Sequence, residues 1–383
     1  MKVYLIAGEP SGDLLASRLM RAMSAKHPKT EFFGVGGKTM ENEGLNSLFD
    51  ISELAVMGIM EVVPSIPHIL KRIKQTVSDI ERVKPDVVVT VDSWSFSARI
   101  HKALKKKKLG IVQVHYVAPQ VWAWKKKRAR TMYKYIDHLL TLFPYEPKYF
   151  TPYRLPTDFV GHPVIESNII YGDKTNFKKS WNISDDQKIM AILPGSRKNE
   201  VARLFPVFLS AAQKFYEKNP DYIFVVPTVH TVEDKVRKMV QNTTLPVIVL
   251  SSEYDRYDAL KASEVAVAAS GTVALELAMV DVPHIIAYRV APFTAFIARH
   301  FLKIQFVNLS NILLGREIVP ELLQENCTED KILYYVSELL KKGDLYERQI
   351  SGFQKVKEIL GMGEQTPSAN AADVIFKIVR EKH

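Results

Sequence analysis

The sequence has one cysteine, Cys327, in 383 residues, so it can form neither an internal disulfide nor a cysteine-based zinc site. A chain without disulfides suits a reducing compartment. Its ten histidines include no close pair with the spacing of metal ligands, and we expect no metal and no cofactor. Every apolar run is shorter than the roughly 18 residues that a spanning helix needs. The N-terminal MKVYLIAGEPSGD is too briefly apolar for a signal peptide and predicts a strand. These absences predict a cytoplasmic protein that is soluble or peripheral on a membrane.

Several nucleotide- and nucleic-acid-binding motifs are also missing. No glycine turn carries the Gly-Lys-Ser/Thr sequence of a P-loop, which disfavours an NTPase. The run Gly34-Val35-Gly36-Gly37 lacks the spacing of a Gly-x-Gly-x-x-Gly fingerprint, which disfavours a dehydrogenase. No recognisable nucleic-acid motif is present, so we expect no nucleic-acid partner.

The charge is unbalanced, with 52 basic against 42 acidic residues and a formal net charge of +10. Such an excess favours anionic partners, including acidic lipids and phosphorylated substrates. The run at 105–108 is as well explained by a solvated face as by a partner. The run at 125–128 directly follows Trp122 and Trp124, and tryptophan beside lysine is typical of a lipid headgroup boundary.

The pattern along the chain predicts an α/β protein. A chain of 383 residues is too long for one ordinary core, so two domains are the natural expectation. Apolar strand patterns alternate with helical ones, which implies parallel sheets with right-handed crossovers. The polar stretch 167–180 suits a linker, and the tail from 328 is expected to be helical, with Ser368 as an N-cap. The predicted strands are 3–7, 86–91, 110–117, 137–143, 189–193, 222–226, 246–250, 265–269 and 284–287.

Two segments of the second half, 188–200 and 264–277, each predict a strand, a short glycine turn and a helix. Such a turn offers backbone N–H groups and the positive end of a helix dipole to a phosphate. Two turns suggest a diphosphate ligand at the carboxyl ends of a parallel sheet. For the first turn alone, a purely structural role is the commoner outcome. In the second segment, Glu276 could contact a ribose or pack against a neighbouring cation. The candidate residues are Gly195, Ser196 and Arg197 in the first segment and Gly271, Thr272 and Glu276 in the second.

Acidic residues follow two strands of the first half. Glu9, Ser11 and Asp13 lie between the first strand and the first helix, where they could cap the helix, contact a ligand, or both. Asp92 directly follows an apolar strand, so its carboxylate is expected to be partly desolvated and suited to accept a proton from a hydroxyl. A turn or a helix cap explains Asp92 equally well.

Residues 57–75 are apolar early and basic late, with Ile66, Ile69, Leu70 and Ile73 on one helical stripe. Such a helix could lie on a membrane surface or receive acyl chains. An ordinary helix facing the core is the alternative.

Seven blocks in this order resemble the lipid-A-disaccharide synthase family of glycosyltransferases, glycosyltransferase family 19. They are AGEPSGD (7–13), GVGG with MGIMEVVP (34–37 and 57–64), HYVAPQVWAW (115–124), FVGHPV (159–164), LPGSRKNEV (193–201), ASGTVALELA (269–278) and NILLGREIVPELLQ (311–324). The resemblance covers nearly the whole chain.

The resemblance implies the GT-B architecture, with two Rossmann-like domains facing across a cleft. It implies an acceptor-side and membrane-docking domain at 1–166, a UDP-sugar-binding domain at 181–355, and C-terminal helices at 356–383 that cross back to the first domain. The implied substrates are UDP-2,3-diacylglucosamine and 2,3-diacylglucosamine 1-phosphate, joined with inversion and without a metal into a β-1,6 disaccharide 1-phosphate. The implied location is the cytoplasmic surface of the inner membrane.

The resemblance also implies a role for each candidate. Asp92 matches the catalytic base, Arg197 with Gly195 and Ser196 would stabilise departing UDP, and Glu276 would bind ribose. Further donor-side matches are Gly271, Thr272, Asn311, Arg316, Glu317 and Gln324, and the acceptor-side matches are Glu9, Ser11, Gly12 and Asp13. The residues implied to contact membrane or acyl chains are Met57, Ile59, Met60, Val62, Val63, Ile66, Ile69, Leu70, Trp122 and Trp124.

The sequence departs from the family in two places and leaves rival functions open. Asp92 is followed by Ser93-Trp94 rather than the usual proline two residues on, and Pro64 and Pro67 are expected to interrupt the apolar helix. The nearest rival is another GT-B enzyme acting on a UDP-sugar, such as a muropeptide glycosyltransferase or a UDP-N-acetylglucosamine 2-epimerase. Rivals of another class are a basic nucleic-acid-binding protein and a lipid-binding module without turnover.

Overall fold

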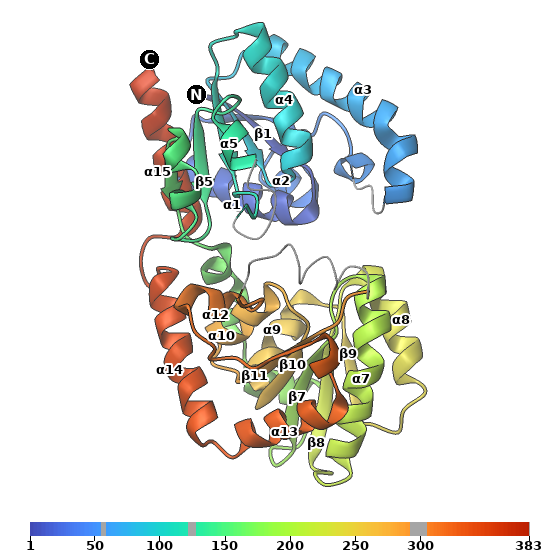
Figure 1. Cartoon of the computed structure of the whole chain (residues 1–383). Helices are drawn as coiled ribbons and strands as arrows, with labels where there is room; N and C mark the ends of the chain where they lie inside the picture. Colours follow the sequence, from blue (N-terminus) through green and yellow to red (C-terminus); the bar gives the residue numbers. More distant parts are fainter. Residues whose placement is uncertain (55–58, 122–127, 292–304, 383) are drawn as a thin grey trace. The chain divides into compact units, whose positions relative to one another are not determined.

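The computed structural model describes residues 1–54, 59–121, 128–291 and 305–382, without the side chains of 59–66, 253 and 254. It confirms the predicted α/β class, since each of two compact units contains one six-stranded parallel sheet (Figure 1). The first unit comprises Met1–Pro163 and Gly363–His383, and the second comprises Val164–Met362.

The sheet of the first unit has the order β2-β1-β3-β4-β5-β6. Its strands are β1 (Lys2–Ala7), β2 (Glu31–Val35), β3 (Val87–Val91), β4 (Val112–Tyr116), β5 (His138–Thr141) and β6 (Thr157–Phe159). The helices are α1 (Pro10–Lys26), α2 (Lys38–Asn42), α3 (Ile59–Val83), α4 (Trp94–Lys107), α5 (Ala129–Met132) and α15 (Pro367–Lys382). Helices α1 and α15 bury apolar side chains against one face of the sheet, and α3 and α4 cover the other. The last helix of the chain therefore completes the core of the first unit.

The sheet of the second unit has the order β12-β11-β10-β7-β8-β9. Its strands are β7 (Lys188–Leu193), β8 (Tyr222–Pro227), β9 (Val247–Leu250), β10 (Val265–Ala268), β11 (His284–Tyr288) and β12 (Glu321–Leu323). The helices are α6 (Lys174–Ser180), α7 (Lys198–Tyr216), α8 (His230–Val240), α9 (Glu253–Ala262), α10 (Val273–Met279), α12 (Leu309–Leu314), α13 (Glu329–Leu340) and α14 (Asp344–Ile359). Apolar side chains of α7, α8 and α13 share one buried cluster with the strands.

Three local expectations were wrong. The stretch 167–180 is not an irregular linker, because Asp173 accepts the amides of Thr175 and Asn176 and so caps α6. Helix α3 runs through Pro64 and Pro67, and its later residues bury Ile73 and other apolar side chains against the sheet. Ser368 lies inside α15 rather than at its N-cap. Among the described helices, none is both long and apolar enough to cross a membrane.

Candidate functional site

The first cluster lies at the carboxyl edge of the first sheet, where β1 and β3 end side by side. Ala7 pairs with Val91 in register, so the segments that follow, beginning at Gly8 and Asp92, must meet. The Ser93 hydroxyl donates a hydrogen bond of 2.8 Å to the Glu9 carboxylate. Two predicted site segments that are more than 80 residues apart in sequence are therefore joined.

Asp92 has an unusual backbone. Its φ is 54° and that of Ser93 is 43°, so two successive residues with side chains adopt the left-handed conformation. Such a conformation costs about 1–2 kcal/mol per residue and is concentrated at functional sites. The Ser93 amide donates to the Asp92 carboxylate at 2.7 Å, and the Ser97 hydroxyl donates to the Asp92 carbonyl at 3.0 Å. These bonds hold the turn in place.

The environment of Asp92 increases its proton affinity. Burial raises the pKa of the Asp92 carboxyl above its ordinary value, and the negative charge of Glu9 raises it further, against the amide of Ser93. A carboxylate that holds a proton more tightly is a better general base. The expected partial desolvation of Asp92 is thus present in the structure.

Gly8 and Gly12, at the junction of β1 and α1, allow this segment to approach β3 closely. A Cβ on Gly8 would lie 2.8 Å from the Ser93 Cβ, and one on Gly12 would lie 3.1 Å from the Val91 carbonyl oxygen. Glu9 and Ser11 are exposed at this edge. Gly12 therefore serves close backbone packing beside Asp92.

Asp13 contacts protein groups instead of pointing into an open site. Its side chain is buried and accepts the amides of Gly37, Thr39 and Met40 and the hydroxyl of Thr39, at 2.6–3.2 Å. These donors lie at the start of α2, so Asp13 caps α2 from the neighbouring helix. The expectation that Asp13 faces the sugars does not fit this arrangement.

The second cluster lies at the carboxyl edge of the second sheet. Strands β7 and β10 are neighbours, with Ala268 paired to Leu193, so the two predicted glycine turns follow adjacent strand ends. Gly195 has a φ of +106°, which the turn requires of a glycine. Gly271 and Thr272 are exposed, and a Cβ on Gly271 would contact nothing within 4 Å among the described residues.

In the first of these glycine turns, at 195–197, backbone amides already have an acceptor within the protein. Those of Ser196 and Arg197 donate to the Glu200 carboxylate at 3.3 Å each, and the Arg197 guanidinium donates to it at 2.8 Å. The hydroxyl of Tyr288 donates to the same carboxylate at 2.9 Å. We did not expect Glu200 and Tyr288 at this edge. Glu200 lies in the LPGSRKNEV block, where its position three residues after the N-cap residue Arg197 was the available signal.

Glu276 forms an ion pair with Arg256 of α9, and both side chains are largely buried. The alternative kept open for Glu276, an acid packed against a cation, describes this contact. The pair fixes the side chain near the second turn.

The polar block after residue 310 divides into buried and exposed residues. Asn311 is fully buried. The oxygen of its side chain accepts from the backbone amides of Ile318 and Val319, and the side-chain nitrogen donates to the Val319 carbonyl and to the Glu321 carboxylate. Its hydrogen-bonding capacity is thus used within the protein. Arg316 and Glu317 are exposed beyond α12, and Gln324, with a φ of 53°, follows β12 at the carboxyl edge.

The predicted membrane contacts are described only in part. Ile69 packs against the core of the first unit, whereas Leu70 is 52% exposed. Met57, Trp122 and Trp124 lie outside the described residues, as do the side chains of Ile59, Met60, Val62, Val63 and Ile66.

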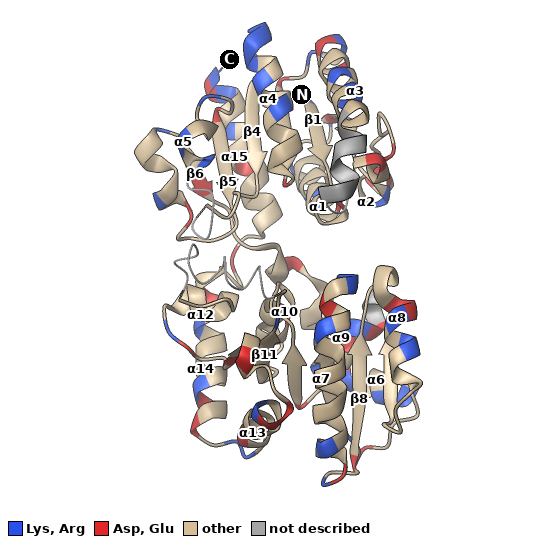
Figure 2. Ribbon diagram, turned by 45° about the vertical axis from the view of Figure 1, so that its right-hand side comes forward, with Lys and Arg blue, Asp and Glu red and all other residues tan. Residues whose placement is uncertain are grey.

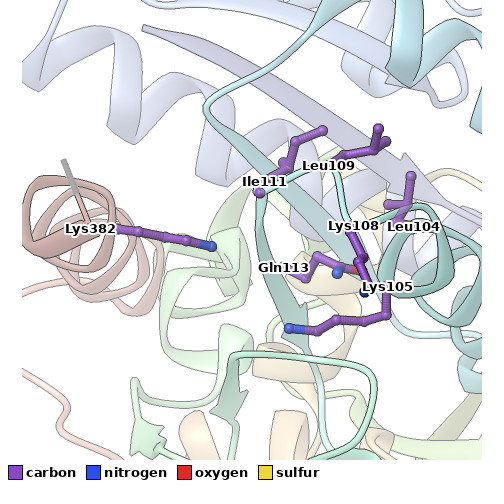
Figure 3. A pocket seen from close by; sticks show the side chains of 8 residues that line it. Leu104, Lys105, Lys108, Leu109, Ile111, Gln113 and Lys382 are labelled. Atoms are coloured by element: carbon purple, nitrogen blue, oxygen red, sulfur yellow. The ribbon is translucent and has the colours of Figure 1, made fainter.

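A basic cavity of about 280 Å³ lies at the amino end of β4, the opposite end of the sheet from Asp92. Figure 3 shows Lys382 of α15 reaching toward Gln113, with Lys105 and Lys108 alongside. Lys105 forms an ion pair of 2.5 Å with Asp137. The lysines at the end of α4 are blue in Figure 2. The basic run at 105–108, for which the sequence favoured neither a partner nor a solvated face, therefore contributes Lys105 and Lys108 to the lining of this cavity.

Within the described residues, no group of three or more His, Cys, Asp or Glu could hold a metal ion.

Two units that each contain a six-stranded parallel sheet are the architecture of the GT-B fold. Solved structures share this fold. They include a UDP-GlcNAc 2-epimerase from Neisseria meningitidis bound to UDP-GlcNAc (TM-score 0.66, 15% identity, 100% of both chains) and MurG from Acinetobacter baumannii (TM-score 0.55, 13% identity, 99% of both chains).

Sequence comparison identifies the family. The chain belongs to the lipid-A-disaccharide synthetase family of glycosyltransferases, whose family model matches residues 3–375. The lipid-A-disaccharide synthase of Paramagnetospirillum magneticum is 46% identical over 384 residues, covering 100% of this chain and 98% of that protein. The enzyme of Rhodospirillum centenum is 43% identical over 381 residues, covering 99% and 95%. The predicted family and its glycosyltransferase class are confirmed.

Proposed function

We propose that the protein transfers the diacylglucosamine unit of UDP-2,3-diacylglucosamine to the 6-hydroxyl of 2,3-diacylglucosamine 1-phosphate. The products are a β-1,6-linked disaccharide 1-phosphate and UDP. Membership of the family supports the reaction, since relatives at 43% and 46% identity over nearly the whole chain are lipid-A-disaccharide synthases.

Asp92 is proposed as the general base, and its partly buried carboxylate is the observation that carries this assignment. The acceptor 6-hydroxyl oxygen attacks the donor anomeric carbon while the bond from that carbon to the UDP oxygen breaks. The hydroxyl proton passes to Asp92, and the electron pair of the broken bond stays with UDP. Attack from the face opposite the leaving group inverts the anomeric configuration. Glu9 and Ser93 keep the base in place through their hydrogen bond.

The donor is assigned to the second unit. Its uridine diphosphate would bind at the carboxyl edge, with Arg197 and the Gly271-Thr272 turn beside the phosphates and Glu276 beside the ribose. The family's polar block would complete the donor side through Arg316, Glu317 and Gln324. Positive charge that faces the departing diphosphate stabilises the transition state more than the ground state, so the proposal requires no metal.

Both proposed substrates are acylated, so we also propose that the protein works at the cytoplasmic face of the inner membrane. The exposed Leu70 on α3 supports this, because it follows the apolar part of the segment and precedes Lys71 and Arg72.

Product analysis tests the reaction. With radiolabelled UDP-diacylglucosamine, a disaccharide 1-phosphate should form only when diacylglucosamine 1-phosphate is also present. Conversion of the labelled donor without a second sugar would instead indicate an epimerase-type enzyme. A protein that binds vesicles but releases no UDP would indicate a lipid-binding module.

A further inference from the structure

The carboxylate of Glu200, in the second unit, accepts four hydrogen bonds. One oxygen accepts the amides of Ser196 and Arg197 at 3.3 Å, and the other accepts the Arg197 guanidinium at 2.8 Å and the Tyr288 hydroxyl at 2.9 Å. The Glu200 side chain is 13% exposed, whereas that of Arg197 is 74% exposed. A half-buried acid thus holds one nitrogen of a guanidinium whose side chain is largely exposed to solvent.

The strand order of the second sheet determines which segments the hydrogen bond between Tyr288 and Glu200 connects. Strands β11, β10 and β7 are consecutive neighbours, Glu200 follows β7, and Tyr288 ends β11. Strands β7 and β11 lie about 10 Å apart, because neighbouring strands are separated by about 4.8 Å. The hydrogen bond from Tyr288 to Glu200 therefore spans the end of β10, where the Gly271-Thr272 turn begins. Glu200 thus links the turn after β7 to the end of β11, and the link crosses the end of the strand between them.

The turn is shaped to admit this carboxylate. A Cβ on Gly195 would lie 2.7 Å from the Glu200 Oε2 atom, so only glycine leaves it room. Because that oxygen accepts hydrogen bonds from the backbone amides of Ser196 and Arg197, these amides bind Glu200. The exposed guanidinium of Arg197 remains accessible to a ligand.

We propose that Glu200 is a positioning residue for donor binding, acting through Arg197. It fixes the guanidinium and the turn before the ligand arrives, so that the diphosphate is held by the Arg197 side chain rather than by the amides of Ser196 and Arg197. Prior fixation of a long side chain removes part of the entropy cost of binding. The four donors on Glu200 offset its negative charge, which limits its repulsion of the ligand. This inference rests on the proposed function.

A double-mutant cycle on UDP affinity tests the inference. Calorimetry would compare the wild-type chain, Glu200→Gln, Arg197→Ala and the double variant, with thermal unfolding of each. Glu200→Gln should weaken UDP binding about tenfold, the loss expected for one hydrogen bond to a charged group. In the Arg197→Ala background the same substitution should have no further effect, because its action passes through Arg197.

Two further variants complete the experiment. Glu217→Gln changes the net charge equally at the other end of α7, where Glu217 is exposed, and should leave UDP affinity unchanged. Tyr288→Phe removes one donor to Glu200 and keeps the ring, so it should weaken UDP binding less than Glu200→Gln. If Glu200→Gln does not fold, Tyr288→Phe still tests whether the contacts of Glu200 affect UDP affinity.

The contrary outcomes are distinct. Additive losses in the double variant would give Glu200 a general structural role, and unchanged affinity in both Glu200→Gln and Tyr288→Phe would remove it from donor binding. Tighter UDP binding by Glu200→Gln would show that the carboxylate competes with the phosphates. If the folded wild-type chain binds no UDP, the proposed function fails as well.

Discussion

At the scale of single residues, Asp92 combines a left-handed backbone, partial burial and a neighbouring acid. Each feature has a separate physical consequence, and together they suit proton transfer. The adjacent Ser93 keeps the carboxylate oriented through its amide and contacts Glu9 through its hydroxyl. The role of Asp92 is therefore testable separately from the binding of the donor.

Replacing Asp92 with Asn keeps the shape of the side chain and removes the base. We expect kcat to fall about 10²–10⁴-fold, the usual contribution of general base catalysis. UDP affinity should stay unchanged, because Asp92 is in the first unit and the donor is assigned to the second. Steady-state kinetics and calorimetry measure the two effects, with the exposed Asp234→Asn as control. Near wild-type kcat would remove Asp92 from the chemistry.

The raised pKa of Asp92 predicts how the rate depends on pH. A base acts only when deprotonated, so the rate should rise with pH, and its midpoint should lie above the ordinary 3.8 of an aspartate. Burial is the main cause of the shift, and the charge of Glu9 adds to it. Glu9→Gln removes that charge, so it should move the acid limb of the kcat profile to lower pH. An acid limb that stays in place or moves to higher pH would contradict the proposed electrostatic contact.

Individual polar residues also mark where prediction from sequence stops. Asp13 and Asn311 lie in motifs shared with the family, and the resemblance implied that both face a ligand. In the structure Asp13 caps a helix and Asn311 bridges buried backbone groups. A polar residue in a motif can serve the ligand or the loop around it, and only the tertiary contacts distinguish the two.

At the scale of elements, the sequence predicted central strands better than edge strands. Strands β2, β6 and β12 were not expected, and each lies at the edge of its sheet. Each has two or fewer buried residues, so the apolar signal is weak. Central strands such as β3 are buried throughout and give continuous apolar runs.

The contact between Asp13 and the start of α2 should contribute measurably to the stability of the first unit. Asp13→Ala leaves three buried or half-buried amides without their acceptor, so we expect a loss of about 2–4 kcal/mol in the free energy of unfolding. Denaturant titration of the whole chain measures it. The exposed Ser11→Ala, two residues earlier in the same turn, should cost little. Equal losses for the two variants would show that the hydrogen bonds of Asp13 are not what stabilises this turn.

Helix α3 offers a test of the proposed membrane contact. Leu70 is 52% exposed and Ile73 is buried in the core, so the two positions separate surface binding from folding. Leu70→Glu should reduce partition into vesicles with acidic lipids about tenfold or more, the equivalent of withdrawing one leucine from an apolar phase. Its thermal unfolding should match that of the wild-type protein. Unchanged partition would exclude Leu70 from the contact.

At the scale of the whole molecule, the two units repeat one plan. Each has a six-stranded parallel sheet, and in each the predicted ligand-side residues follow the carboxyl ends of strands. The order of seven sequence blocks predicted the family, because catalytic and donor-side turns recur at fixed places in such a fold. Hydrogen bonds between distant segments, such as those of Glu200 with Tyr288, depend on strand order and could not be predicted from spacing along the chain.

Calorimetric titration of the folded protein with UDP, and separately with uridine, tests the central proposal most directly. If the second unit holds a sugar nucleotide through its diphosphate, one UDP should bind per chain, and uridine should bind at least tenfold more weakly, since each 1.4 kcal/mol of phosphate contact changes affinity tenfold. A folded chain that takes up no UDP, or that binds uridine equally well, would contradict the proposal.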